Sequence, residues 1–395
     1  MKNKCVTGII IASFLALTGF FTVFNFPVIR QAFSGFTAHP DNISAFGKEM
    51  SAAMKSDKLF HKDDLINMNG LYARLTGRRL YNEVVLMNNG MLNYSEMKLN
   101  AKTCEIPQTL ADFSDFVEKQ GGKFVYVQFP GKYDRENALM PDGISPQIRK
   151  EVNGLTDLIG KAGVDVLDLH SLLADSAADI EENYYITDHH WKPTAAFKAF
   201  QAIMEHLQQL FPDESYSGEA LNTGSWTVHE IPDQFLGSFG RRVGVFFRGS
   251  DDLQWLTPDF ETEISFSYPL EDIFLKGDFE HTMIRKEYLE PEMDKLHTDN
   301  YFVYIGDNYP FTRTENQMPL SDQKVLLLHD SYSLPVIAFL STVFREVDAI
   351  DTRSYADYYP EMPVKTYVEQ TRPDIVIMAL SPYPDVINHK NTFRF

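Results

Sequence analysis

The sequence predicts an α/β protein, a doubly wound parallel sheet with a β-rich insertion, preceded by an N-terminal transmembrane helix. Three observations predict this fold class. An uncharged apolar run opens the chain, short apolar segments alternate with amphipathic ones from about residue 106, and residues 215–320 interrupt that alternation. The chain has 395 residues, of which 44% are hydrophobic, so it is long enough for one large core or two modest ones.

The N-terminal run has no charged residue between Cys5 and Ile29, and it is long enough to span a bilayer. Lys2 and Lys4 precede it, so the positive-inside rule predicts a cytoplasmic N-terminus and an extracellular bulk. A cleaved signal peptide is the alternative, but "SGFTA" offers a poor cleavage site. We therefore expect residues 1–30 to form a cytoplasmic stub and an uncleaved single-pass anchor in the cell membrane.

Residues 31–105 are expected to form an extracellular tether with helices and a hairpin. Helical patterns cover about 42–54 and 63–75. The segment "EVVLMNNGMLNY" then predicts a hairpin, because its Asn89-Gly90 pair suits a tight turn that needs positive φ.

From residue 106 to the C-terminus, helices and buried strands are expected to alternate. Amphipathic segments with glycine stops precede the apolar runs, and a long amphipathic helix follows Pro193. Short continuous apolar runs are typical of parallel strands that are covered on both faces. The predicted strands are "KFVYVQF" (123–129), "VDVLDLH" (164–170), "KVLLLHD" (324–330), "EVDAID" (346–351) and "DIVIMAL" (374–380).

Residues 215–320 are aromatic-rich and turn-rich, with short segments such as "SWTVHEIP" and "EISFSYP". We interpret them as a β-rich insertion within the α/β domain. The formal net charge of −19 argues against a nucleic-acid partner, which would need basic patches. Only Cys5 and Cys104 are present, so no disulfide is expected within the exported part.

The loop "HDSYS" contains a candidate nucleophile. In open α/β sheets, ligands bind outside the carboxyl ends of the strands. A buried strand ends at His329, so the Ser331 hydroxyl is expected at that edge, near the start of an apolar helix whose N–H groups favour an oxyanion. The alternative is that Ser331 and Ser333 are helix N-caps.

The loop "TDHHW" supplies a possible base for that serine. A serine nucleophile needs a nearby base, and the base needs an orienting carboxylate. In an extended stretch, residues i and i+2 point the same way, so Asp188 is expected to hold His190 while His189 points elsewhere. A metal site on Asp188, His189 and His190 is one alternative, and plain turn and capping chemistry is another. We predict no metal and no cofactor, since no further ligand cluster accompanies the motif.

These motifs resemble the DHHW protein family, which is similar to the SGNH-hydrolase-like domains of alginate O-acetylation proteins. In those relatives the Asp-x-His element also precedes the serine. The resemblance covers roughly residues 80–395, and this chain has His329 where the family more often has lysine. Further matching segments are "FLGSFGRR" (235–242), "IGDNYPFTRTEN" (305–316) and "VDAIDTR" (347–353).

The resemblance implies a membrane-anchored, extracellular SGNH-type O-acyltransferase or acylesterase that acts on cell-surface or exported polysaccharide. A membrane-bound O-acyltransferase is the implied partner. Ser331 would be the nucleophile, His190 the general base and Asp188 its orienter. Asn308 and Gly131 are the implied oxyanion donors, and Lys132 is a possible substrate contact. The alternative is a catalytically silent cell-surface scaffold or glycan-binding partner of an acyltransferase complex.

Overall fold

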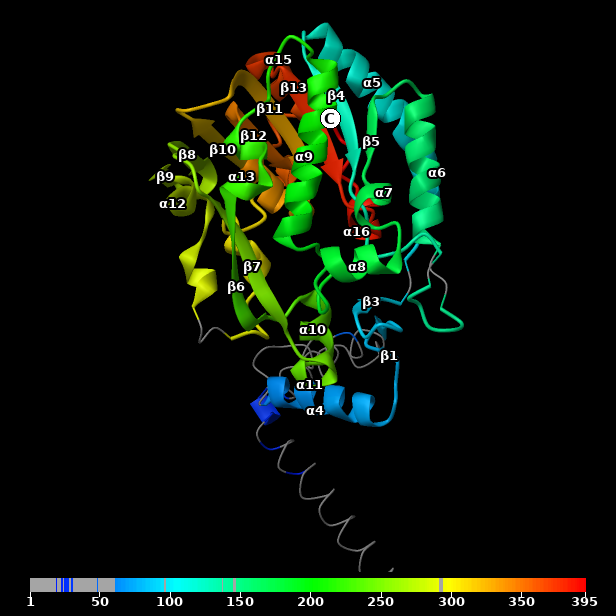
Figure 1. The fold of residues 1–395 in the computed structure, drawn as a ribbon. Coiled ribbons are helices and arrows are strands. Elements are labelled where there is room, and N and C mark those ends of the chain that lie inside the picture. The colour runs from blue at the N-terminus through cyan, green and yellow to red at the C-terminus, as the bar shows by residue number, and fades with distance from the viewer. Residues whose placement is uncertain are drawn as a thin grey trace, which may run out of the picture. The chain divides into compact units, whose positions relative to one another are not determined.

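The computed structural model describes residues 61–395 except 96, 137, 145–146 and 291–293, together with a few scattered positions before residue 61 (Figure 1). The chain divides into two compact units, Met1–Leu71 and Tyr72–Phe395. The predicted anchor and the predicted helix over 42–54 lie almost entirely outside the described residues. Within the described part, no helix is both long enough and apolar enough to cross a bilayer. The predicted helix over 63–75 is confirmed as α4 (Lys62–Leu75).

A mixed eight-stranded sheet forms the centre of the second unit, with strand order β5-β4-β13-β11-β12-β10-β8-β9 (Figure 1). The five strands from β5 to β12 are parallel, and each falls within or close to a predicted apolar run. In sheet order the strands are β5 (Val166–Asp168), β4 (Lys123–Gln128), β13 (Ile375–Leu380), β11 (Ser321–His329), β12 (Phe344–Asp351), β10 (Phe311–Asn316), β8 (Ile264–Tyr268) and β9 (Ile273–Gly277).

The prediction of a doubly wound parallel sheet holds for these five strands and is wrong at one edge. β10 pairs antiparallel with β12, and β8 and β9 continue the antiparallel pairing outward. All three strands come from the region predicted as the insertion or its end, so that region extends the sheet. Its remaining strands, β6 (Trp226–Phe235) and β7 (Asp251–Pro258), form a separate antiparallel ribbon.

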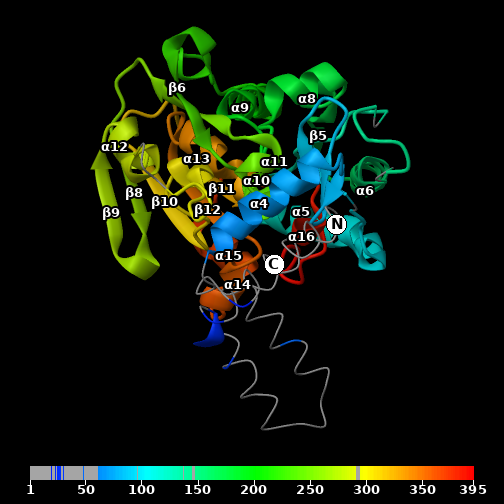
Figure 2. The ribbon, with the colours of Figure 1, turned by 90° about the horizontal axis from the view of Figure 1, so that it is seen from below.

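Helices cover both faces of the sheet, as a doubly wound fold requires. α9 (Pro193–Leu210) and α13 (Leu334–Leu340) pack on the face that presents Val125, Leu327 and Ile377. α5 (Ile106–Lys119) and α15 (Val364–Thr371) pack on the opposite face. Figure 2 shows the sheet between these two helix layers. Alternate residues of each buried strand thus enter two different cores, which explains the continuous apolar runs.

The predicted hairpin is confirmed and belongs to a small sheet, β1 (Leu80–Tyr81), β2 (Val84–Leu86) and β3 (Leu92–Tyr94). Gly90 has φ +84° in its turn, a conformation that favours glycine. The other helices are α6 (Ile148–Lys161), α7 (His170–Leu173), α8 (Ala177–Asn183), α10 (Ser238–Val243), α11 (Val245–Arg248), α12 (Phe279–Met283), α14 (Tyr355–Tyr358) and α16 (Pro384–Ile387).

Candidate active site

Ser331 lies directly beyond the carboxyl end of β11, where a 3-10 turn (Ser331–Ser333) runs into α13. The preceding residue, Asp330, fixes this turn. Its Oδ1 accepts the backbone N–H of Tyr332 at 2.9 Å, and its Oδ2 accepts the N–H and hydroxyl of Ser381 at 2.8 and 2.6 Å. Because Ser381 follows β13, one buried carboxylate ties two strand ends together. Ser331 itself is partly exposed, unlike the fully buried Asp330 before it.

His190 lies between the predicted nucleophile and the predicted orienting carboxylate. Its Nε2 is 2.9 Å from Ser331 Oγ, and its Nδ1 is 2.6 Å from Asp188 Oδ1. The Tyr301 ring stacks on the imidazole at a centroid distance of 3.8 Å and an interplanar angle of 10°. These contacts hold the imidazole in one orientation. The structure therefore brings Asp188, His190 and Ser331 together in the order that a serine nucleophile requires.

Asp188 is fully buried, and polar groups surround both of its carboxylate oxygens. Its Oδ1 also accepts the backbone N–H of His190 at 2.8 Å, and its Oδ2 accepts the N–H of Ser238. Burial alone would raise the pKa of Asp188, but the electrostatic interactions with His189 and His190 and the hydrogen bonds from His190 outweigh it and hold the pKa well below its ordinary value. Asp188 is therefore an ionised acceptor at neutral pH.

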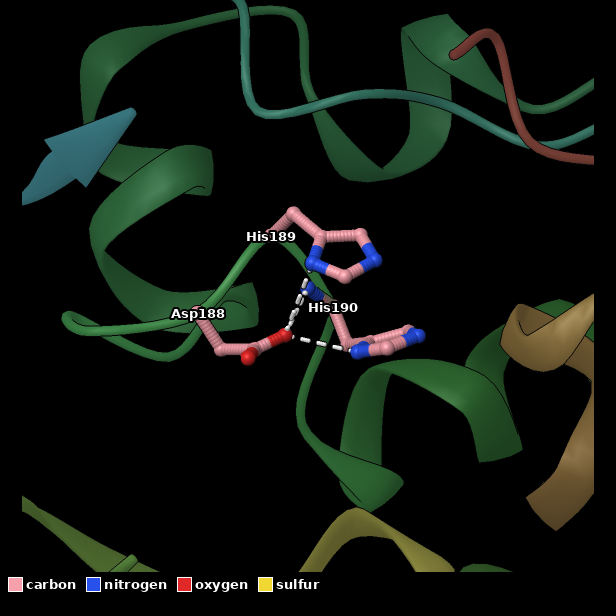
Figure 3. Close-up of side chains that lie close together, drawn as sticks. All are labelled: Asp188, His189 and His190. Atoms are coloured by element: carbon pink, nitrogen blue, oxygen red, sulfur yellow. Dashed lines mark hydrogen bonds and ion pairs between the residues drawn. The ribbon is translucent and has the colours of Figure 1, made fainter. Parts of the chain in front are cut away.

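His189 contacts the same carboxylate, so the expectation that it points elsewhere is wrong (Figure 3). Its Nδ1 lies 3.2 Å from Asp188 Oδ1 and 2.8 Å from Ser238 Oγ. The reason is a turn: because Asp188 accepts the N–H of His190, the segment is not extended and i, i+2 alternation fails. Burial, reinforced by the neighbouring charge of His190, lowers the pKa of His189 to about 3, so this imidazole is neutral.

The donor atoms of Asp188, His189 and His190 lie within 4.8 Å of one another, as in a small metal site. Two ligands of a tetrahedral zinc ion lie about 3.3 Å apart, since each is about 2.0–2.1 Å from the metal. The 2.6 Å separation of His190 Nδ1 and Asp188 Oδ1 is a hydrogen-bond distance instead. The donor set therefore fits a hydrogen-bonded carboxylate better than a metal ion.

Lys132 is fully buried beneath the loop that carries these residues, so the structure contradicts a direct substrate contact. Its ammonium group donates to the carbonyl oxygens of Tyr185, Ile186 (3.0 Å) and Asp188 (2.9 Å). Burial lowers its pKa to about 7, against the attraction of Asp251 and Asp188. The physical reason for the correction is that three main-chain acceptors occupy its three donors. Lys132 positions the loop.

Gly131 and Asn308 are not joined to Ser331 by any hydrogen bond among the described residues. A Cβ at Gly131 would lie 2.7 Å from Pro382 Cγ, so glycine allows the loops after β4 and β13 to approach closely. Asn308 follows a turn with positive φ at Ile305 and Gly306, and its buried Oδ1 has no partner in the described part of the chain. Their roles as oxyanion donors stay predictions.

The residues that hold Asp188 and its loop are not evident from the sequence. Asp251, at the start of β7, accepts the N–H groups of Ile186 and Thr187 at 2.6 and 2.8 Å. A Cβ at Gly237 would lie 2.2 Å from the Asp188 Cβ, so only glycine fits there. Gly237 and its neighbour Ser238 lie in the segment "FLGSFGRR", which resembles a family segment but by its sequence alone indicates no role for either residue.

The indole of Trp191 links the two candidate catalytic loops. Trp191 is fully buried, and its Nε1 donates to the carbonyl oxygen of Tyr332 at 3.1 Å. In return, the Tyr332 hydroxyl donates to the carbonyl oxygen of His189. The hydrogen bond between His190 and Ser331 is therefore flanked by two contacts that fix the loops against each other.

Similarity to known proteins supports an SGNH-like acyl-transfer domain, the class of protein that the Asp188–His190–Ser331 geometry suggests. Residues 91–243 match the family model of the SGNH hydrolase-like domain, acetyltransferase AlgX. The resemblance predicted from the motifs is thus confirmed. No curated protein sequence matches this chain.

Solved structures show the same fold at low sequence identity. Bacillus cereus PatB1 has a TM-score of 0.63 with 20% identity, over 79% of this chain and 99% of that one. Its structure with a sulfonyl adduct has a TM-score of 0.62 with 21% identity, over 80% and 99%. A DHHW family protein from Eubacterium siraeum has a TM-score of 0.55 with 16% identity, over 79% and 94%. The chain has an SGNH-like α/β fold.

Proposed function

We propose that this protein is a membrane-anchored, extracellular serine O-acyltransferase or acylesterase that acts on cell-surface or exported polysaccharide. The observation that carries the proposal is the continuous contact from Asp188 through His190 to Ser331, at 2.6 and 2.9 Å. The match of residues 91–243 to an acetyltransferase domain model supports acyl transfer as the reaction class. The charge-free run before Ile29 supports the membrane anchor.

In the first half of the reaction, Ser331 Oγ attacks the carbonyl carbon of an acyl ester and His190 Nε2 takes the hydroxyl proton. Asp188, ionised and bonded to Nδ1, stabilises the imidazolium that forms. The tetrahedral intermediate collapses when the ester C–O bond breaks, and His190 gives its proton to the departing alkoxide. Ser331 is then esterified by the acyl group.

In the second half, a sugar hydroxyl or water attacks the acyl-serine. His190 removes the proton of the attacking oxygen, the bond to Ser331 Oγ breaks, and His190 returns that proton to Ser331. A glycan hydroxyl yields an O-acylated polysaccharide, and water yields the free acid. A membrane-bound O-acyltransferase is the proposed source of the acyl group.

The developing oxyanion needs hydrogen-bond donors. We assign this role to the backbone N–H groups of Ser331 and Gly131, with the side-chain amide of Asn308 as a third candidate. Within the described residues, neither backbone N–H donates a hydrogen bond to a protein group, which leaves both available.

Labelling of the full-length chain with a fluorophosphonate probe tests the proposal. Wild type should label, and Ser331→Ala and His190→Ala should each abolish labelling. Ser333→Ala is the matched control, because Ser333 lies in the same turn and its buried Oγ has no partner among the described residues. Absence of labelling in folded wild type would favour a silent scaffold or glycan-binding partner. Labelling that survives Ser331→Ala would exclude Ser331 as the nucleophile.

A further inference from the structure

A cleft of about 510 Å³ lies beside the candidate catalytic loops. Four side chains from separate elements give it its chemistry. Tyr94 comes from the end of β3, Arg242 from α10, Asp385 from α16, and Glu83 from the turn between β1 and β2. No residue proposed above for the reaction itself lines this cleft.

Tyr94 forms the wall between the cleft and the catalytic loops. Its ring lies 6.3 Å from the His189 ring and 5.9 Å from the Tyr383 ring, measured between centroids. The Tyr383 hydroxyl donates to the carbonyl oxygen of His189 at 3.2 Å. Burial raises the pKa of Tyr94 to about 12; the charge of Arg242 opposes this increase, and the charges of Asp385, Asp188 and Glu83 add to it. A molecule in the cleft is therefore one side chain away from the Asp188–His190 segment.

The polar groups of the cleft suit an uncharged polyhydroxylated ligand. Arg242 lies over the Tyr94 ring at 5.3 Å and offers N–H donors, while the exposed carboxylates of Glu83 and Asp385 offer acceptors. Arg242 is 3.6 Å from Glu83, and no hydrogen bond or ion pair engages the Asp385 carboxylate among the described residues. Sugar hydroxyls both donate and accept, so they match this mixture.

The charge balance of the cleft selects among glycans. Two carboxylates face one guanidinium, and the whole chain carries a net charge of −19. A polyuronate would place its own carboxylates against Glu83 and Asp385, and such like-charge contacts oppose binding. We propose that this cleft is the subsite for the glycan that receives or carries the acyl group, and that it takes a glycan without acidic groups. This inference rests on the proposed function of the neighbouring site.

Binding to the full-length Ser331→Ala variant tests the inference without depending on turnover. The ligands are neutral oligosaccharides of N-acetylglucosamine, glucose and mannose, and a mannuronate oligomer of equal length. We expect at least one neutral oligosaccharide to bind about tenfold more tightly than the uronate. Asp385→Asn or Asp385→Ala should weaken that binding about tenfold, the effect of losing a hydrogen bond to a charged group.

Reversal of the charge of the cleft provides a second test of the same inference. Glu83→Lys combined with Asp385→Lys should reverse the preference toward the uronate, whereas Asp213→Lys should leave it unchanged. Asp213 is the matched control because it is exposed and follows the far end of α9, about 27 Å from its start beside His190. Tighter binding of the uronate to the unreversed cleft, or no binding of any neutral oligosaccharide, would overturn the proposal. Neutral-glycan binding with this preference, together with no fluorophosphonate labelling of folded wild type, would instead count against Ser331 as nucleophile and leave the inference about the cleft standing.

Discussion

At the scale of single residues, the candidate site depends on groups that never touch a substrate. The ionised Asp188 has no solvent contact, and the backbone N–H groups of His190 and Ser238 solvate it instead. Such preorganised hydrogen bonds keep a buried carboxylate charged at little cost on each reaction cycle. The conformation of the loop is therefore as important as the identity of its side chains.

Gly237 gives the sharpest steric prediction. In Gly237→Ala the new methyl group would overlap the Asp188 side chain, since the separation of the two Cβ atoms would be only 2.2 Å. We expect a loss of about 1–3 kcal/mol in the free energy of unfolding and much slower fluorophosphonate labelling. Urea denaturation and labelling rates measure both effects.

The matched control for this substitution is Gly154→Ala. Gly154 lies within α6, and a Cβ there would meet no atom within 4 Å. That variant should be more stable than wild type by up to about 1 kcal/mol, because alanine favours the helix. Unchanged stability and labelling in Gly237→Ala would mean that Asp188 can move aside freely.

Lys132 predicts a pH dependence of stability. Its pKa is lowered by burial from 10.5 to about 7, so between these pH values the unfolded chain holds a proton that the native chain lacks. The contribution of Lys132 to stability therefore rises with pH across this window, and it falls as pH drops toward 7. In Lys132→Met this dependence is absent. The unfolding free energy of wild type minus that of the variant should therefore increase as pH rises.

Urea denaturation of both proteins at several pH values within this window measures that difference. Lys119→Met, a substitution at an exposed lysine near the end of α5, is the control and should give a constant difference. A constant difference for Lys132→Met as well would show that burial does not lower the pKa of Lys132.

At the scale of secondary-structure elements, one contact joins the ends of two neighbouring parallel strands. Asp330 follows β11 and Ser381 follows β13, and they share two hydrogen bonds. Burial raises the pKa of Asp330, while Arg353 and the bonds from Ser381 oppose that increase. The turn that presents Ser331 is therefore held by its neighbour in the sheet.

Ser381→Ala removes the hydroxyl half of this contact. We expect a loss of about 1.5–3 kcal/mol in the free energy of unfolding, the range for a hydrogen bond to a charged group. Ser333→Ala, in the same turn, should change stability little because its Oγ has no partner in the described region. Equal effects of the two substitutions would show that the Asp330–Ser381 contact does not stabilise the turn.

At the scale of the whole molecule, short sequence patterns predict the elements whose signals lie within their own residues. The buried parallel strands appear as apolar runs, and α9 and the β2–β3 hairpin carry their own start and turn signals. The antiparallel edge was missed because β10 pairs with β12, which follows it by about 30 residues and by an intervening strand. The hydrophobic pattern within β10 does not specify which strand it pairs with.

In the candidate site too, residues with a local sequence signal are predictable, and residues that come from distant segments are not. Asp188 and His190 lie two residues apart, and Ser331 follows a recognisable strand, so their types and spacing suffice to suggest chemistry. Asp251 and Ser238 bond to the same loop from 64 and 50 residues further along the chain. Lys132 is evident in the sequence as a candidate, but its burial depends on the helices and loops that close over it. These contacts exist only in the folded molecule.

One measurement tests the central claim most directly. Incubation of the full-length protein with an activated acetyl ester, followed by proteolysis and mass spectrometry, locates any acetyl group on the chain. We predict a single acetyl group on the peptide that contains Ser331, absent from Ser331→Ala and formed much more slowly in His190→Ala.

The most informative contrary result involves the second serine near an imidazole. Ser238 Oγ lies 2.8 Å from Nδ1 of His189, so it is the natural competitor for the acyl group. Acetylation of Ser238 in place of Ser331, or an adduct that forms equally fast without His190, would contradict the assignment of nucleophile and base.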